Sequence, residues 1–422
     1  MSPGVVLLLV TLLAGLYMAW TIGANDVANA MGTSVGSGAL TLTAAIAVAG
    51  VMEFSGAVVM GSGVTDTISK GIIETSLFAP DGPLGPSGPH QLALAMLSAL
   101  ISAALWLHFA THFGLPVSTT HSIVGAVLGV GILSFGWNGV NWGTMLQILG
   151  SWVVSPVLGG LLAFVTFWNV RKHILRSPDP IAATRRVAPH MVAIVVAVMF
   201  LSFIYKVLKN RIDAPPVLMS VGLSLVAGGA VGIVVGYLIR RREPRPGGTP
   251  YAYVERMFGM LQISTACFVA FAHGANDVAN AVGPLAAVVS LYRNGYATIS
   301  TQVTVPFWVL VAGGLGIVIG LATFGYRVIA TIGKQITEMT PTRGFSAEFG
   351  AATTVLVASS LGLPISTTHT LVGGVIGVGF AQGIGALNLR VVRNIVTSWL
   401  ATVPAAAATA AVIFLVLRTV LH

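Results

Sequence analysis

The sequence predicts an all-α polytopic membrane protein, with about 12 transmembrane or re-entrant helical segments in two inverted-topology repeats. Only 8% of its 422 residues are charged and 55% are hydrophobic, whereas charged residues make up about 25% of soluble domains. A soluble fold of this composition would lack the polar surface that water requires. Two polar motifs that each occur twice among the apolar runs predict the repeats.

Apolar runs long enough to cross about 30 Å of hydrocarbon, which takes roughly 20 residues each, recur along the whole chain. Glycine and proline interrupt several runs, which allows some of them to be re-entrant hairpins that line a cavity. We divide the chain into a first repeat (1–170), a central helix pair with basic loops (171–257) and a second repeat (258–422). The predicted segments lie near 4–22, 39–61, 91–112, 118–135, 145–168, 190–208, 216–239, 259–273, 303–324, 347–363, 366–382 and 392–418.

The net charge is +9, and many of the lysine and arginine residues lie in two short stretches. This distribution explains the positive charge, so the charge does not indicate a nucleic-acid partner. Cytoplasmic loops of membrane proteins are enriched in basic residues, and two apolar segments separate these stretches. We therefore place both loops, near 171–186 and 240–245, in the cytoplasm of a multi-pass plasma-membrane protein, with both termini outside. The residues concerned are Arg171, Lys172, Arg176, Arg185 and Arg186, then Arg240, Arg241, Arg242 and Arg245.

Several other classes of protein are disfavoured. No basic residue precedes Lys70 and further apolar segments follow at once, so the first segment does not read as a cleaved signal peptide. The single cysteine, Cys267, excludes an intrachain disulfide. No repeated metal-ligand cluster and no nucleophile beside a base stands out, so we expect no enzyme and no cofactor.

The duplicated motifs recur in the same order and at nearly the same spacing. The octapeptide GANDVANA stands at 23–30 and 274–281, and PVSTTH at 116–121 matches PISTTH at 364–369. If each half contributes five segments, the first half begins outside and the second begins inside. Inverted repeats of this kind are typical of secondary transporters, because exchanging the repeat conformations switches the side that a midplane site faces. A duplicated scaffold or a channel is the alternative.

The Asn-Asp motif places a carboxylate deep in an apolar segment. On a helix, Asn25 and Asn29 are four residues apart and share a face with Asp26. Such a carboxylate must be protonated, paired or bound to a cation, and oxygen ligands suit a hard cation such as sodium. The alternative is that these residues cap a broken helix or link helices by hydrogen bonds. The second copy repeats the pattern at Asn276, Asp277 and Asn280.

The Ser-Thr-Thr-His motif lies where one apolar segment ends and another begins, which indicates a helix N-terminus. Free backbone N–H groups, the positive end of the helix dipole and adjacent hydroxyls suit a tetrahedral oxyanion without arginine. Ordinary N-capping is the alternative. His121 and His369 could orient the hydroxyls, bind the anion or carry protons, and we favour orientation. Glu53 and Glu348 are further acids within apolar stretches, functional candidates unless they only bond a neighbouring helix.

These motifs resemble the signature of the inorganic phosphate transporter (PiT) family, in its sodium/phosphate symporter branch: a repeated G-x-N-D-x-x-N element accompanied by a repeated P-x-S-x-T-H element. The resemblance covers nearly the whole chain and implies phosphate-binding and cation-binding residues. For phosphate they are Ser118, Thr119, Thr120, Ser366, Thr367, Thr368, Asn25 and Asn276. For the cation they are Asp26, Asn29, Asp277 and Asn280, with sodium at Asp26 and Asp277, supported by Glu53, Glu348, His121 and His369. Many relatives carry a large hydrophilic domain between the halves, whereas the central loops here are short, so regulation through such a domain is not expected.

The expected activity is import of inorganic phosphate by cation symport through alternating access, with sodium as the favoured ion. Divalent phosphate entering a negative-inside cell costs roughly 4.6 kcal/mol per 100 mV, so uptake must be driven. A protonated phosphate oxygen can donate a hydrogen bond to a carboxylate, which sulfate cannot do. Proton-coupled phosphate or sulfate transport and an oxyanion channel remain alternatives. The partners expected are phosphate, sodium or protons, and lipid, and a homodimer is left open.

Overall fold

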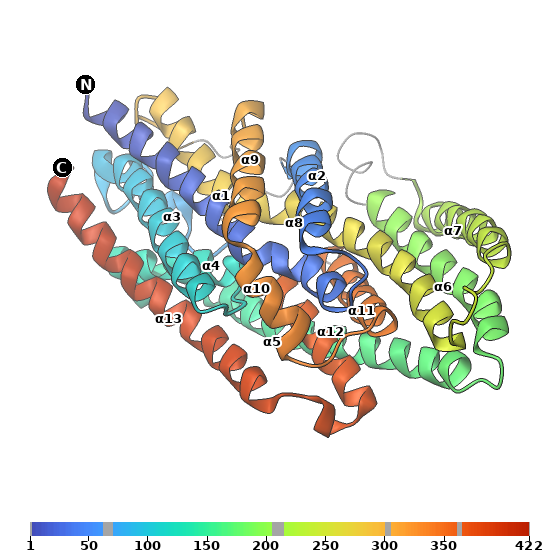
Figure 1. Cartoon of the computed structure of the whole chain (residues 1–422). Coiled ribbons are helices and arrows are strands. Elements are labelled where there is room, and N and C mark those ends of the chain that lie inside the picture. The colour runs from blue at the N-terminus through green and yellow to red at the C-terminus, as the bar shows by residue number, and fades with distance from the viewer. Residues whose placement is uncertain (1, 62–70, 205–214, 300–304, 361–364, 422) are drawn as a thin grey trace.

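The computed structural model describes residues 2–61, 71–204, 215–299, 305–360 and 365–421 (Figure 1). Within these ranges the chain forms helices, turns and one isolated antiparallel bridge, so the all-α prediction is confirmed. The main helices are α1 (Pro3–Gly36), α2 (Leu42–Met60), α3 (Gly88–His112), α4 (Thr119–Phe135), α5 (Trp142–Val170), α6 (Pro180–Phe203), α7 (Val217–Arg240), α8 (Pro250–Arg293), α9 (Phe307–Phe324), α10 (Tyr326–Ala330), α11 (Pro341–Ser360), α12 (Thr367–Gln382) and α13 (Leu389–Val420).

Nine helices in the described ranges are long and apolar enough to cross a membrane. The count of 12 segments stays a prediction, because α4 and α12 are shorter, with 17 and 16 residues. Helix α8 is one continuous helix of 44 residues, so the predicted segment 259–273 was too short. The GANDVANA motif made the sequence look interrupted there, although both copies lie inside long helices.

Two long antiparallel helices, α1 and α8, cross the centre of the molecule. The start of α1 lies beside the end of α8, where Gly4 faces Tyr292 and Tyr296, and beyond the end of α1 Ser37 donates to Gln262 early in α8. Helix α9 packs on α1, and α2 packs on α8 (Figure 1). The acids of the two Asn-Asp motifs therefore belong to the two innermost helices.

One helix pair completes each half. Helices α3 and α4 pack against α13, whereas α11 and α12 pack against α5, so each pair contacts the last helix of the other half. Glycines allow this close approach: a Cβ at Gly129 of α4 would overlap the carbonyl of Ala407, and one at Gly377 of α12 would overlap that of Gly160. Corresponding helices thus make corresponding contacts, while the inverted orientation in a membrane stays a prediction.

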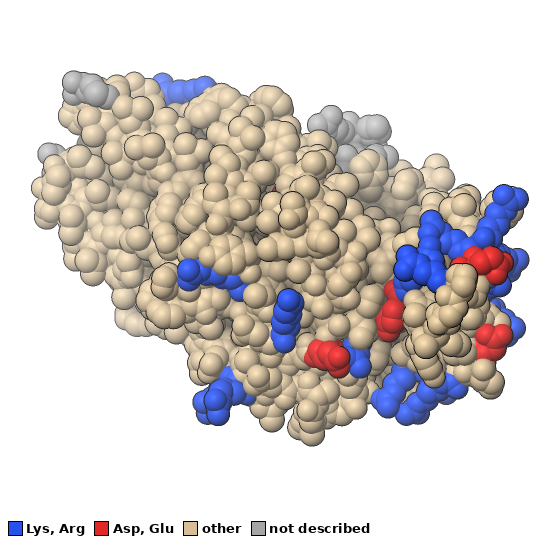
Figure 2. All heavy atoms as spheres, viewed as in Figure 1, with Lys and Arg blue, Asp and Glu red and all other residues tan. Residues whose placement is uncertain are grey.

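The central helices α6 and α7 pack on each other at one end of the molecule and contact α8 and a π-helical extension of α5 (Arg171–Leu175). Figure 2 shows many of the lysine and arginine side chains gathered at this end. Arg185 and Arg186 lie in α6, so the prediction that they belong to a loop was wrong. The helix starts early because Asp179 accepts hydrogen bonds from the backbone N–H groups of Ile181 and Ala182. The predicted boundary at 257/258 falls inside α8, and the division into three parts is otherwise untested.

Candidate ion and oxyanion site

Asp26 of α1 and Asp277 of α8 form a buried acidic pair at the crossing of the two central helices. Asp26 is 1% exposed and Asp277 is 2% exposed. Together with His273, one turn before Asp277, they offer ligand atoms that all lie within 4.8 Å of one another. Carboxylates this deep in an apolar bundle need compensation by hydrogen bonds, a cation or a proton.

Hydroxyl groups from the starts of α4 and α12 reach these carboxylates. Thr119 donates to Oδ2 of Asp26, and Thr368 donates to Oδ1 of the same residue at 3.0 Å. Thr367 donates to Oδ2 of Asp277 at 3.2 Å. Asp26 is therefore bonded by both halves of the chain, and the carboxylate and hydroxyl oxygens together fit the preferences of a hard cation such as sodium.

The predicted helix N-termini are confirmed. Ser118 caps α4 by accepting from the backbone N–H of His121, and Ser366 caps α12 by accepting from that of His369. Both hydroxyls therefore serve as N-caps, which is the alternative role that the sequence allowed for them. The N-termini of both helices nevertheless point toward the acids, since the next residues are the threonines that bond them.

The asparagines of the motif differ in what they do. Asn25 holds the turn between α3 and α4: its amide donates to Thr111 and to the carbonyl of Leu115, and its oxygen accepts from the N–H of Val117. A phosphate contact would have to replace one of these bonds. Asn280 donates to Oδ1 of Asp277 at 3.3 Å.

Three predicted binding residues remain: Asn276, Thr120 and Asn29. Asn276 and Thr120 are half-buried. The side chain of Asn29 lies outside the described residues, as do residues 361–364, which correspond in the sequence to 113–116 of the first half. The binding roles of all these residues stay predictions.

His121 and His369 lie next to each other, with ring centroids 4.2 Å apart, and each stacks on a tryptophan. His121 stacks on Trp152 of α5, and His369 stacks on Trp399 of α13. In the described part of the chain, the ring contacts recorded for these two histidines are with each other and with the two tryptophans. The proposed orientation of hydroxyls by these histidines stays a prediction.

Sequence reasoning missed His273, which connects two buried acids. Its Nδ1 lies 2.8 Å from Oε2 of Glu53 on α2, and its Nε2 lies 2.6 Å from Oδ2 of Asp277. All three side chains are buried. The signal available was the spacing of four residues between His273 and Asp277, which places both on one helix face.

Glu348 of α11 lies in a separate polar cluster. Its Oε1 accepts from Thr33 and Ser34 of α1 and from Gln262 of α8, and its Oε2 accepts from Thr265 of α8. Because Thr33 follows Asp26 by two turns, this cluster lies roughly 10 Å along α1 from the acidic pair, toward the start of α8. Glu348 does not contact the acidic pair.

Comparisons with known proteins identify the family. The model of the phosphate transporter family matches residues 22–410. The chain belongs to this family. A putative phosphate permease of Pyrococcus abyssi is 47% identical over 97% of this chain and 98% of its own. The chloroplastic inorganic phosphate transporter 2-1 of Arabidopsis thaliana is 46% identical over 96% of this chain and 71% of its own.

A solved structure has the same fold. It is described as the sodium-dependent phosphate transporter, is 44% identical, and has a TM-score of 0.87 over 98% of this chain and 100% of its own. The family resemblance inferred from the duplicated motifs is therefore confirmed, and membership of a transporter family accords with the expectation that the chain is no enzyme.

Proposed function

We propose that the chain imports inorganic phosphate by sodium symport, with the acidic pair and the starts of α4 and α12 as the binding site. Family membership and the sodium-dependent transporter of the same fold support the substrate and the ion. The observation that carries the site is that Asp26 accepts hydroxyl hydrogen bonds from Thr119 and Thr368, one from each half. Movement of one half against the other would open this site to alternate sides of the plasma membrane.

The threonine hydroxyls supply a route for coupling. A hydroxyl has one hydrogen to donate and two lone pairs to accept with. While Thr119 and Thr368 donate to Asp26, their hydrogens are not free for an anion. Sodium at Asp26 would take over the carboxylate, interact with the hydroxyl lone pairs and release both hydrogens toward phosphate. Each ligand would then raise the affinity for the other, as reciprocal linkage requires.

Phosphate would be held by dipoles and hydroxyls. The first backbone N–H groups of α4 and α12 lack partners within their own helices, and both helix dipoles present their positive ends. Among the described residues, the ion pairs recorded for Glu53 and Asp277 are with His273, not with arginine or lysine. A site without an arginine clamp favours release, which a carrier needs as much as binding.

Radiolabelled uptake into liposomes that contain only this protein tests the proposal. We expect accumulation with an inward sodium gradient, little with an inward proton gradient, and weak competition by excess sulfate. Asp26→Asn and Asp277→Asn should each reduce sodium-driven uptake at least tenfold, on the order of the free energy of one hydrogen bond to a charged group.

Other outcomes would change the proposal in specific ways. Normal sodium-driven uptake by either asparagine variant would remove the acidic pair from the site. Accumulation driven by protons would change the ion, and flux without any gradient dependence would indicate a channel. Preference for sulfate would overturn the substrate.

A further inference from the structure

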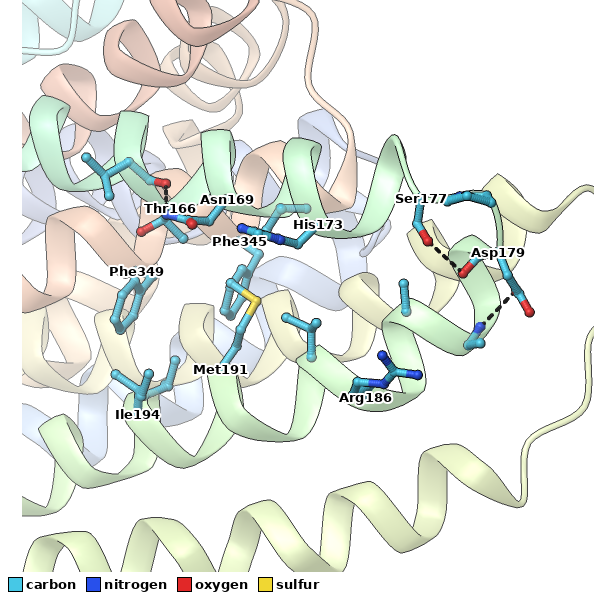
Figure 3. Close-up of a pocket in the computed structure, with 17 residues that line it drawn as sticks. Thr166, Asn169, His173, Ser177, Asp179, Arg186, Met191, Ile194, Phe345 and Phe349 are labelled. Atoms are coloured by element: carbon cyan, nitrogen blue, oxygen red, sulfur yellow. Dashed lines mark hydrogen bonds between the residues drawn. The ribbon is translucent and has the colours of Figure 1, made fainter.

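A cavity of the described chain lies away from the acidic pair, between α5, α6 and α11. It has a volume of about 780 Å³, within the range of about 300–1,000 Å³ typical of small-molecule pockets. Figure 3 shows its two ends. Phe349 and Ile194 lie at one end, and Arg186, Asp179 and Ser177 lie at the other.

The inner end of the cavity, at Phe349, is lined mainly by apolar side chains, with Thr166 and Asn169 of α5 beside them. Phe345 and Phe349 of α11 face Met191 and Ile194 of α6. Both α5 and α6 are candidate membrane spans, and Ile194 is 55% exposed although it lines the cavity. In a bilayer the medium beside such residues is hydrocarbon, so an acyl chain suits this end better than a water-soluble ligand.

The outer end carries an available guanidinium group. Among the described residues, no hydrogen bond or ion pair is recorded for the side chain of Arg186, whereas Arg185 donates to the carbonyl of Arg242 and Arg171 to that of Ala381. Segment 171–186 contains five basic residues and one acid, Asp179. The carboxylate of Asp179 caps α6, where the positive end of the helix dipole offsets its charge.

We propose that this cavity binds an anionic glycerophospholipid, with one acyl chain against Phe345 and Phe349 and the phosphodiester on Arg186. Basic pockets between helices at the cytoplasmic side of a membrane attract anionic headgroups. Guanidinium groups bind phosphate oxygens in a bidentate manner. The cavity thus presents the two chemistries of such a lipid at its two ends and in the right order.

The bound lipid would contact a helix that belongs to the transport machinery. Phe345 and Phe349 flank Glu348 on α11, and Glu348 links that helix to α1 and α8. Helix α11 is followed in the chain by α12, whose start belongs to the proposed binding site. Occupancy of the cavity would therefore affect how α11 moves, so uptake should respond to the lipid composition of the membrane.

Native mass spectrometry of the purified full chain with added phosphatidylglycerol or phosphatidylcholine provides the test. We expect one phosphatidylglycerol retained per chain in preference to phosphatidylcholine. Arg186→Gln should weaken phosphatidylglycerol retention roughly five- to tenfold. Arg393→Gln is the matched control, because it removes the same charge from an exposed position near the start of α13.

A cavity-filling variant, Val187→Phe, keeps the proposal testable without a charge change, since Val187 lines the cavity. It should weaken retention of the lipid while circular dichroism and elution volume stay unchanged. Equal loss in Arg186→Gln and Arg393→Gln would show a diffuse surface effect and overturn the proposal. So would retention insensitive to Val187→Phe, or a dimer in which a second copy covers the cavity.

Discussion

His273 of α8 and Glu53 of α2 form a buried pair, with 2.8 Å between Nδ1 and Oε2, at a place where the two halves of the chain differ. Gly274 packs against the backbone carbonyl of Glu53, as Gly23 packs against that of Ile317. His273 precedes Gly274 as Ile22 precedes Gly23. The polar pair at the crossing of α8 and α2 therefore corresponds to two buried isoleucines at the crossing of α1 and α9.

This difference makes the two acids of the site unequal. Asp277 has His273 within 2.6 Å, whereas Asp26 is bonded by Thr119 and Thr368. Nδ1 of His273 is hydrogen-bonded to Glu53, and Nε2 lies 2.6 Å from Oδ2 of Asp277. We infer that Asp26 is the acid more open to exchange of ligands.

Replacing His273 alone should be worse for stability than replacing His273 and Glu53 together. His273→Ile alone leaves Glu53 buried without its partner, which costs about 3–5 kcal/mol, whereas a packed apolar pair is often neutral. The double variant copies Ile22 and Ile317 of the other half. We expect its melting temperature in detergent to exceed that of His273→Ile, while phosphate uptake is lost in both because Asp277 has lost its histidine partner. A double variant less stable than His273→Ile would contradict this view.

The hydroxyl of Thr119 should affect both ligands. Thr119→Val removes the group that donates to Asp26 and keeps the shape, so we expect the half-saturating concentrations of phosphate and of sodium to rise about tenfold. Thr119→Ser keeps the hydroxyl and is the control. Initial uptake rates at varied phosphate and varied sodium measure both effects. A change for phosphate alone would mean that the hydroxyl does not couple the two ligands.

The sequence was sufficient for those features that depend on neighbouring residues. Apolar runs located most helices, and the duplicated motifs located the starts of α4 and α12, because an N-cap is specified within a few residues. It was also sufficient to single out Glu53 and Glu348, since any acid in an apolar run needs a partner. What the sequence could not provide was the identity of those partners.

The features that were missed depend on contacts between distant segments. Asn25 bonds a turn about 90 residues later in the chain, so its role as a brace is invisible in the motif. His273 was missed because it occurs only in the second half. A search for residues that occur in both halves does not find a residue that occurs in one. Residues 250–293 looked interrupted because buried Asp277 lowers local hydropathy, although tertiary partners satisfy it within an unbroken helix.

Glu348 should contribute to stability through its charge. Three hydroxyls and one amide donate to it, from Thr33, Ser34, Thr265 and Gln262. Glu348→Gln loses an acceptor and turns an amide N–H₂ toward these donors, so we expect a loss of about 1.5–3 kcal/mol in the free energy of unfolding. Unfolding by a denaturing detergent measures it, with the exposed Glu243→Gln as control. An unchanged midpoint for Glu348→Gln would show that the charge is not needed.

The glycines that begin the two Asn-Asp motifs should tolerate no side chain. A Cβ at Gly23 would overlap the carbonyl oxygen of Ile317, and one at Gly274 would overlap that of Glu53. Backbone atoms cannot rotate aside, so Gly23→Ala and Gly274→Ala should each lower the free energy of unfolding by about 1–3 kcal/mol. Gly150→Ala is the control, because that position in α5 has nothing within 4 Å of its Cβ, and alanine there should be neutral or stabilising by about 0.5–1 kcal/mol. Unfolding by a denaturing detergent measures the free energy of unfolding of the three variants. Equal values for all three would mean that the central helices can separate at little cost. The close crossing would then not hold the acidic pair in place.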